Sequence, residues 1–182
     1  MIEIKKVSHY FDKKQVLDKV ELTVNDNSVT GLIGINGAGK STLLRIISGV
    51  YTPTSGEVLI DGVSSQKENA RKDLFFLPDD PYYTINTTGA RLWDMYRVFY
   101  PKMDLNIYKE LLASFKLDEK KPLRNFSKGM RRQAAIILAL SCQPKYLLLD
   151  EAFDGLDPVI RVAVRKLIAE EVLQNDMTVI IS

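Results

Sequence analysis

The sequence predicts an α/β fold with a mainly parallel core sheet, an N-terminal antiparallel β portion and an inserted α-helical subdomain. Short apolar or β-branched segments bounded by turn residues alternate with segments of helical periodicity. Continuous apolar runs such as Tyr146–Leu149 are typical of strands buried in a parallel sheet. Because a domain holds about 150 residues, we expect the 182 residues to form a single domain. Its core is predicted at 1–78 and 143–182, with the helical subdomain at 79–142.

The elements follow from local patterns along the chain. Strands are predicted at Ile2–Val7, Val20–Val24, Val29–Ile33, Glu57–Ile60, Leu74–Leu77, Tyr146–Leu149 and Thr178–Ile181. Helices are predicted at Lys40–Ser48, Arg91–Tyr100, Ile107–Leu117 and Lys128–Ser141, and from Asp157-Pro158 onward. Ser127 is expected to be an N-cap residue and Gly49 a C-cap residue.

The composition excludes several classes of protein. Lys plus Arg is 25 and Asp plus Glu is 23, a net charge of +2, which gives no reason to expect nucleic acid as a partner. Cys142 is the one cysteine, so no internal disulfide is possible, and a reducing compartment is expected. No apolar run approaches the ~18 residues needed to cross a bilayer. A membrane role would therefore need a partner that supplies the spanning helices.

The strongest motif is Gly34-Ile35-Asn36-Gly37-Ala38-Gly39-Lys40-Ser41, which matches the phosphate-binding loop of P-loop NTPases in full. A predicted strand precedes it and a predicted helix follows it, as the loop requires. Glycines let backbone N–H groups turn toward phosphate oxygens, and the helix N-terminus adds positive potential. Lys40 is expected to reach the β- and γ-phosphates and Ser41 to ligate Mg²⁺. The predicted nucleotide-binding residues of this segment are Gly34, Asn36, Gly37, Ala38, Gly39, Lys40, Ser41 and Thr42.

A pair of acids follows the apolar strand Tyr146–Leu149. A buried parallel strand that ends in a carboxylate places it at the carboxyl edge of the sheet, where open α/β folds bind ligands. Asp150 is expected to hold Mg²⁺ and Glu151 to act as the general base that activates water. Taken alone, the pair would favour an interpretation as strand-end acids that face solvent, whereas beside a complete phosphate loop the catalytic interpretation is favoured.

Three further segments give the chain a resemblance to ABC ATPases. Asn125-Phe126-Ser127-Lys128-Gly129-Met130 is similar to their signature motif, and Gly155-Leu156-Asp157 to their D-loop. Leu77-Pro78-Asp79-Asp80-Pro81 stands where the family has its Q-loop. The Ser127–Met130 variant, together with Phe99-Tyr100-Pro101, resembles ATPase subunits of ABC-2-type transporters, many of them bacterial exporters.

The resemblance implies an ATPase that uses ATP and Mg²⁺ and powers a transmembrane permease subunit from the cytoplasmic face of the membrane. Two such domains, identical or unlike, pair head to tail around two ATP molecules. Ser127, Lys128 and Gly129 of one subunit would face the phosphates held by the other, with the D-loop Asp157 nearby. The family also stacks an N-terminal aromatic residue on adenine. Phe11 has the better spacing for this role, and Tyr10 is the alternative.

Departures from the family pattern leave alternatives open. Asp79 replaces the Q-loop glutamine; a carboxylate there can ligate Mg²⁺ and sense nucleotide, or it can belong to a solvated turn. Lys128 replaces the first signature glycine and Met130 the glutamine. Arg131 and Arg132 are expected at the dimer interface or on the exposed surface.

The family's switch histidine normally follows the strand that here ends at Ser182, where the sequence stops. We therefore expect a chain truncated at its C-terminus that binds nucleotide but hydrolyses it poorly. Two other functions compete with the transport ATPase. One is a regulatory nucleotide-binding module with little turnover. The other is a soluble ABC ATPase that acts on ribosomes or DNA, against which the single phosphate loop and the lack of sustained heptads count.

Overall fold

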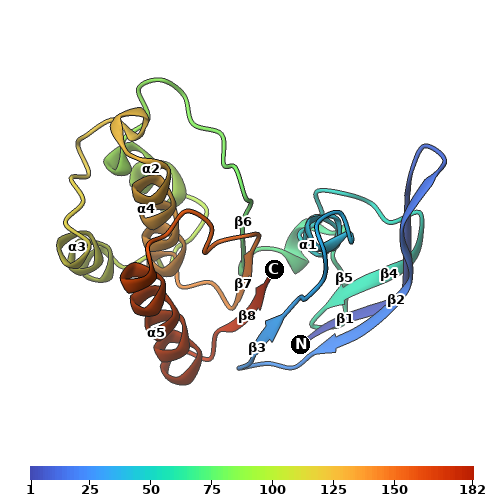
Figure 1. Cartoon of the computed structure of the whole chain (residues 1–182). Coiled ribbons are helices and arrows are strands. Elements are labelled where there is room, and N and C mark those ends of the chain that lie inside the picture. The colour runs from blue at the N-terminus through green and yellow to red at the C-terminus, as the bar shows by residue number, and fades with distance from the viewer.

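Two four-stranded sheets organise the chain in the computed structural model, which describes residues 1–182 (Figure 1). The first sheet is antiparallel and has the order β2 (Lys14–Val24), β1 (Ile2–Phe11), β4 (Ser55–Ile60), β5 (Val63–Ser64). The second is parallel and has the order β3 (Val29–Gly31), β8 (Thr178–Ile181), β7 (Tyr146–Leu149), β6 (Leu74–Leu77). The predicted fold class is therefore confirmed, including the antiparallel N-terminal portion.

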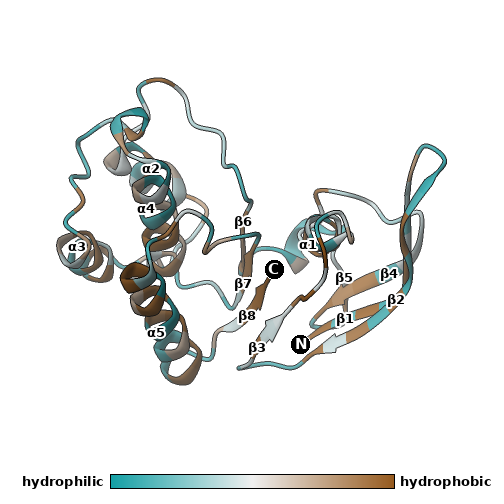
Figure 2. Cartoon of the chain, viewed as in Figure 1, coloured by the Kyte–Doolittle hydropathy of each residue, from teal (hydrophilic) through white to brown (hydrophobic).

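Helix α1 (Lys40–Ile47) lies between the two sheets and buries apolar side chains toward both. Its Leu44 and Ile47 belong to one apolar cluster with Ile4 of β1 and Leu148 of β7. Leu148 reaches this cluster because side chains alternate along a strand, while Leu147 and Leu149 point to the opposite face. Burial on both faces explains the uninterrupted apolar run of β7, seen as a brown strand in Figure 2.

Four helices gather on the other side of the parallel sheet (Figure 1). Two of them, α4 (Lys128–Ser141) and α5 (Pro158–Gln174), share an apolar cluster with β6, β7 and β8. The others, α2 (Gly89–Tyr96) and α3 (Leu105–Ser114), pack with the outer face of α4 in a separate cluster that lies within the predicted 79–142 segment. Short 3₁₀ turns occur at Glu68–Ala70 and Leu123–Asn125. None of the helices is both long and apolar enough to cross a membrane.

The element boundaries differ from the prediction where tertiary pairing overrides local pattern. Strands β1 and β2 form one long hairpin that closes over Asp12, whose φ is 52°. The turn at Asp12-Lys13 and the start of β2 are exposed and polar, the teal tip in Figure 2, so apolar alternation does not extend through the hairpin. Helix α2 begins two residues earlier and ends four residues earlier than the predicted Arg91–Tyr100. Its start is set by Thr88, whose hydroxyl caps the N-terminus by accepting from the amide of Arg91 at 3.2 Å.

Candidate nucleotide site

The phosphate loop connects β3 to α1 and depends on glycine geometry. Gly37 and Gly39 have φ values of 82° and 92°, the left-handed region that favours glycine. A Cβ on Gly39 would lie 2.9 Å from the carbonyl oxygen of Val16 and 2.8 Å from a methyl carbon of Leu17. Glycine is thus required at position 39 both by the backbone angle and by the close approach of β2.

Lys40 folds back over this loop. Its ammonium donates to the carbonyl oxygens of Gly34 at 2.8 Å and Ile35 at 3.1 Å. The ammonium therefore lies beside the N-terminus of α1, whose first backbone N–H groups have no helical partner. Both features present positive charge to the same space, which is the electrostatics that binds phosphate.

A cavity of about 240 Å³ brings the predicted loop residues and the predicted general base together. Its lining consists of Val16, Asn36, Gly37, Gly39, Lys40, Ser41, Thr42 and Glu151. Glu151 follows β7, far along the sequence from the loop, and reaches the cavity because β7 lies in the middle of the parallel sheet. Gly34 and Ala38 shape the loop without lining the cavity.

Asp150 is fully buried at the floor of this site. Its Oδ1 accepts hydrogen bonds from the hydroxyls of Ser41 and Ser182, each at 2.9 Å, while its Oδ2 is buried without a partner. A buried carboxylate oxygen left unpaired costs about 1–3 kcal/mol, so a ligand at this position is favoured. One carboxylate and one hydroxyl fit the oxygen chemistry that Mg²⁺ prefers, with the remaining positions left to water and phosphate.

Ser182 and Val16 are site residues that sequence reasoning missed. Besides donating to Asp150, the Ser182 hydroxyl accepts from the backbone N–H of Glu151 at 3.1 Å, and so ties β8 to both acids. Glu151 itself has φ of 47°, and this contact helps to hold that turn. The sequence offered only the position of Ser182 directly after a predicted strand, and the pairing of that strand with β7 is seen only in the structure.

The signature and D-loop segments contact each other rather than the loop's cavity. Ser127 caps α4, its hydroxyl accepting from the amide of Met130 at 3.1 Å, as predicted. A Cβ on Gly129 would lie 2.7 Å from the carbonyl oxygen of Gly155. Asp157 caps α5 and accepts from the amide of Ile160 at 3.0 Å. Lys128 lines a separate cavity of about 740 Å³. The roles of these residues across a dimer stay predictions.

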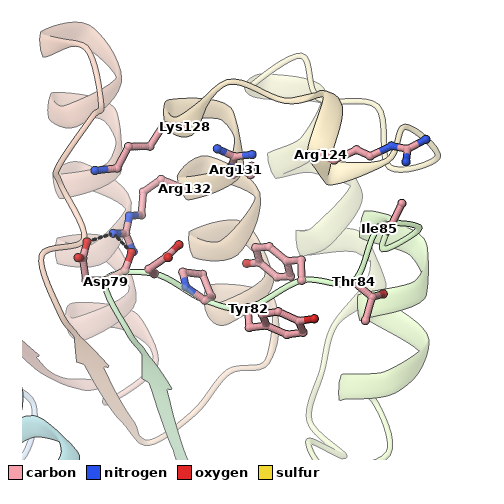
Figure 3. A pocket seen from close by; sticks show the side chains of 11 residues that line it. Asp79, Tyr82, Thr84, Ile85, Arg124, Lys128, Arg131 and Arg132 are labelled. Atoms are coloured by element: carbon pink, nitrogen blue, oxygen red, sulfur yellow. Dashed lines mark hydrogen bonds and ion pairs between the residues drawn. The ribbon is translucent and has the colours of Figure 1, made fainter.

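Asp79 lines that second cavity and not the one at the phosphate loop (Figure 3). Its carboxylate accepts from Arg132 at 2.9 Å. The expectation that Arg132 lies on an exposed surface is wrong, because only 4% of the residue is exposed. Tyr83 lines the same cavity, and its burial, together with neighbouring Tyr96, raises its pKa to about 12. A magnesium-binding role for Asp79 stays a prediction.

Phe11 lies at the end of β1 with nearly half of its surface exposed, 44%. Its ring meets His9 edge-on at 4.8 Å between centroids and Tyr51 at 5.7 Å. His9 is buried in this aromatic cluster, in keeping with a packing role. Tyr10, the alternative, is similarly exposed at 42%, so exposure does not separate the two, and adenine stacking by Phe11 stays a prediction.

Comparisons with known proteins agree with this geometry. A family profile described as "ABC transporter" matches residues 17–154. The chain is 35% identical over 184 residues to the ABC transporter ATP-binding protein YtrB of Bacillus subtilis (strain 168), covering 100% of this chain and 63% of YtrB. It is 30% identical over 186 residues to the lantibiotic transport ATP-binding protein SrtF of Streptococcus pyogenes, covering 100% of this chain and 79% of SrtF.

The fold has the same relatives among solved structures. An ATP-binding subunit of an ABC transporter superimposes with a TM-score of 0.89 at 27% identity, over 100% of this chain and 78% of that one. This chain spans 63% of the length of YtrB, which is less than two thirds. It spans 79% of SrtF and 78% of the ATP-binding subunit. On the family match and these relatives together, the chain belongs to the ABC transporter family, in which its relatives are ATP-binding proteins.

Proposed function

We propose that this chain binds ATP with Mg²⁺, hydrolyses it, and powers a membrane permease through ATP-driven association of two ATPase domains. One observation carries the proposal: Glu151 shares a cavity with the loop residues Lys40 and Ser41 beside the buried carboxylate of Asp150. A glycine loop with an acid pair at the end of another strand of the same parallel sheet is an arrangement that suits phosphoryl transfer to water.

Each residue of the site has a distinct task. The backbone N–H groups of the loop and the Lys40 ammonium hold the phosphates. Lys40 exchanges its bonds to the carbonyls of Gly34 and Ile35 for bonds to phosphate oxygens, which changes the partner but not the charge-assisted character of the contact. Glu151 orients a water molecule and accepts its proton. Asp150 and Ser41 would hold Mg²⁺, and the ion would supply positive charge to neutralise the phosphate oxygens.

The signature residues act on a second copy or an unlike subunit. Ser127 begins α4, whose unpaired N-terminal amides attract anions. Facing the phosphates held by a partner subunit, Ser127, Lys128 and Gly129 complete the site, so that ATP joins the two domains and hydrolysis releases them. Phe11 stacks on adenine.

The permease partner supplies the membrane-spanning helices and holds this chain at the cytoplasmic face. Export is the direction that we propose, from the resemblance of the Ser127–Met130 segment to ABC-2-type ATPases. The relatives carry names of both kinds, among them methionine import for MetN of Clostridium acetobutylicum and lipopolysaccharide export for LptB of Haemophilus influenzae. A transport assay with the permease in vesicles of defined sidedness decides the direction.

Substitution Glu151→Gln tests the enzymatic part. The amide keeps the shape of the side chain but cannot accept the proton of water, so turnover falls about 10²–10⁴-fold, while ATP affinity stays within about twofold of the parent chain. Glu110→Gln is the matched control, because Glu110 is exposed on α3 and makes no ion pair. Unchanged turnover in the Glu151→Gln variant would exclude Glu151 as the base.

A further inference from the structure

Arg132 carries a buried charge and is one of the residues that line the cavity of about 740 Å³. Its guanidinium donates to the carbonyl oxygen of Pro78 at 2.9 Å, to the carboxylate of Asp79 at 2.9 Å, and to the backbone oxygen of Asp79. Figure 3 shows the side chain extending from α4 to Asp79, whereas the labelled neighbours Arg131 and Arg124 have no such bonds. A guanidinium this buried is tolerated because both of its terminal nitrogens donate hydrogen bonds and its charge is paired with Asp79.

This contact joins the segment after β6 to helix α4, which begins with the signature residues. Pro78 directly follows β6, and the carbonyl of Leu77, the last residue of β6, accepts from the amide of Asp150 at 2.9 Å. Arg132 itself lies on α4, five residues after the cap residue Ser127. The Arg132 side chain therefore joins the helix that begins with the signature to the end of β6, which is itself hydrogen-bonded to the backbone of Asp150.

We propose that Arg132 is a positioning residue, which fixes the N-terminus of α4 relative to the Asp150–Glu151 edge, with Asp79 as its acceptor. The arginine suits this task because its planar fork binds a carbonyl and a carboxylate at once, which fixes an orientation as well as a distance. Asp79 then contributes through Arg132 rather than as a ligand of Mg²⁺. The inference rests on the proposed function, since it concerns how signature and acids are held for catalysis.

The first test compares Asp79→Asn, Arg132→Lys and the double variant in the whole chain, with ATP and Mg²⁺ titrated separately. Each single variant lowers kcat about five- to tenfold and leaves KM for ATP and the Mg²⁺ midpoint within about twofold. The double variant is no worse than the poorer single one, because both substitutions break the same contact. Asp80→Asn and Arg124→Gln, which alter neighbours in the same cavity that make no ion pair, leave kcat unchanged.

Three results would overturn the proposal. A Mg²⁺ midpoint raised tenfold by Asp79→Asn and untouched by Arg132→Lys would make Asp79 a metal ligand instead. Multiplying effects in the double variant would show that the two residues act independently. Unchanged kcat in both single variants would remove the positioning role.

A second measurement does not depend on turnover and separates this proposal from the proposed function. Hydrogen exchange in the nucleotide-free chain should rise for the amides of residues 79–83 in Asp79→Asn and Arg132→Lys, and not in the two control variants. Unaltered exchange refutes the contact in solution, whether or not the chain hydrolyses ATP. Raised exchange in a chain without measurable turnover leaves the contact standing and counts against the enzymatic function.

Discussion

The phosphate loop with its acid pair and the signature region with the Pro78–Ile85 segment are held in different ways. The loop is shaped mainly by main-chain geometry, namely left-handed glycines and the close approach of Val16, and the acids follow β7, which is buried on both faces. The signature region depends more on side chains, namely the Ser127 cap and the Arg132 contacts, beside one close main-chain approach between Gly129 and Gly155. Main-chain geometry does not depend on a partner, whereas side-chain contacts can be exchanged. The nucleotide pocket is thus preorganised, and the signature is the adjustable half.

Gly39→Ala disrupts the phosphate loop and has the largest expected effect. The new Cβ meets the Val16 carbonyl at 2.9 Å in a backbone conformation with φ of 92°, so the free energy of unfolding falls by about 2–3 kcal/mol and ATP binding is lost. Urea unfolding and nucleotide titration measure both. Gly31→Ala is the matched control, because a Cβ there meets nothing within 4 Å. Equal stability of the two variants would contradict a loop fixed by its glycines.

Gly129→Ala perturbs the signature region. Its Cβ would meet the Gly155 carbonyl at 2.7 Å, which forces the start of α4 away from the segment before α5 and costs about 1–2 kcal/mol of stability. ATP affinity of the isolated chain should stay within about twofold, while ATP-driven association is lost. A loss of ATP affinity as large as that of Gly39→Ala would show that the two halves are not separate.

Ser182→Ala has the smallest expected effect and tests how Asp150 and Glu151 are held in place. It removes a hydrogen bond to Asp150 and one from the amide of Glu151, which lowers the free energy of unfolding by about 1 kcal/mol. Urea unfolding measures it, with Ser114→Ala at the exposed end of α3 as the control. A variant as stable as the control would mean that Ser182 does not support the turn at Glu151.

The contrast between the two halves also explains what could be predicted. The loop and the acids were predictable because their chemistry needs fixed residue types at fixed spacing, as in Gly34–Ser41 and in the acids that follow Leu149. The helix starts at Ser127 and Asp157 were predictable because capping is local.

Contacts between distant residues were not predictable. Arg132 and Asp79 are 53 residues apart, and nothing in the local pattern distinguishes Arg132 from its neighbour Arg131. The same holds for Ser182 and Asp150, which are 32 residues apart. It also holds for the distal part of the β1–β2 hairpin, where cross-strand pairs such as Tyr10 with Gln15 and Phe11 with Lys14 show no apolar alternation.

Light scattering of the chain carrying Glu151→Gln, with and without ATP and Mg²⁺, tests whether ATP joins two of these domains. The variant retains the preorganised pocket but cannot release ATP by hydrolysis, so we expect a dimer that forms only when ATP and Mg²⁺ are both present. A chain that stays monomeric at saturating ATP, although titration shows nucleotide bound, would contradict association of two identical domains through their signatures.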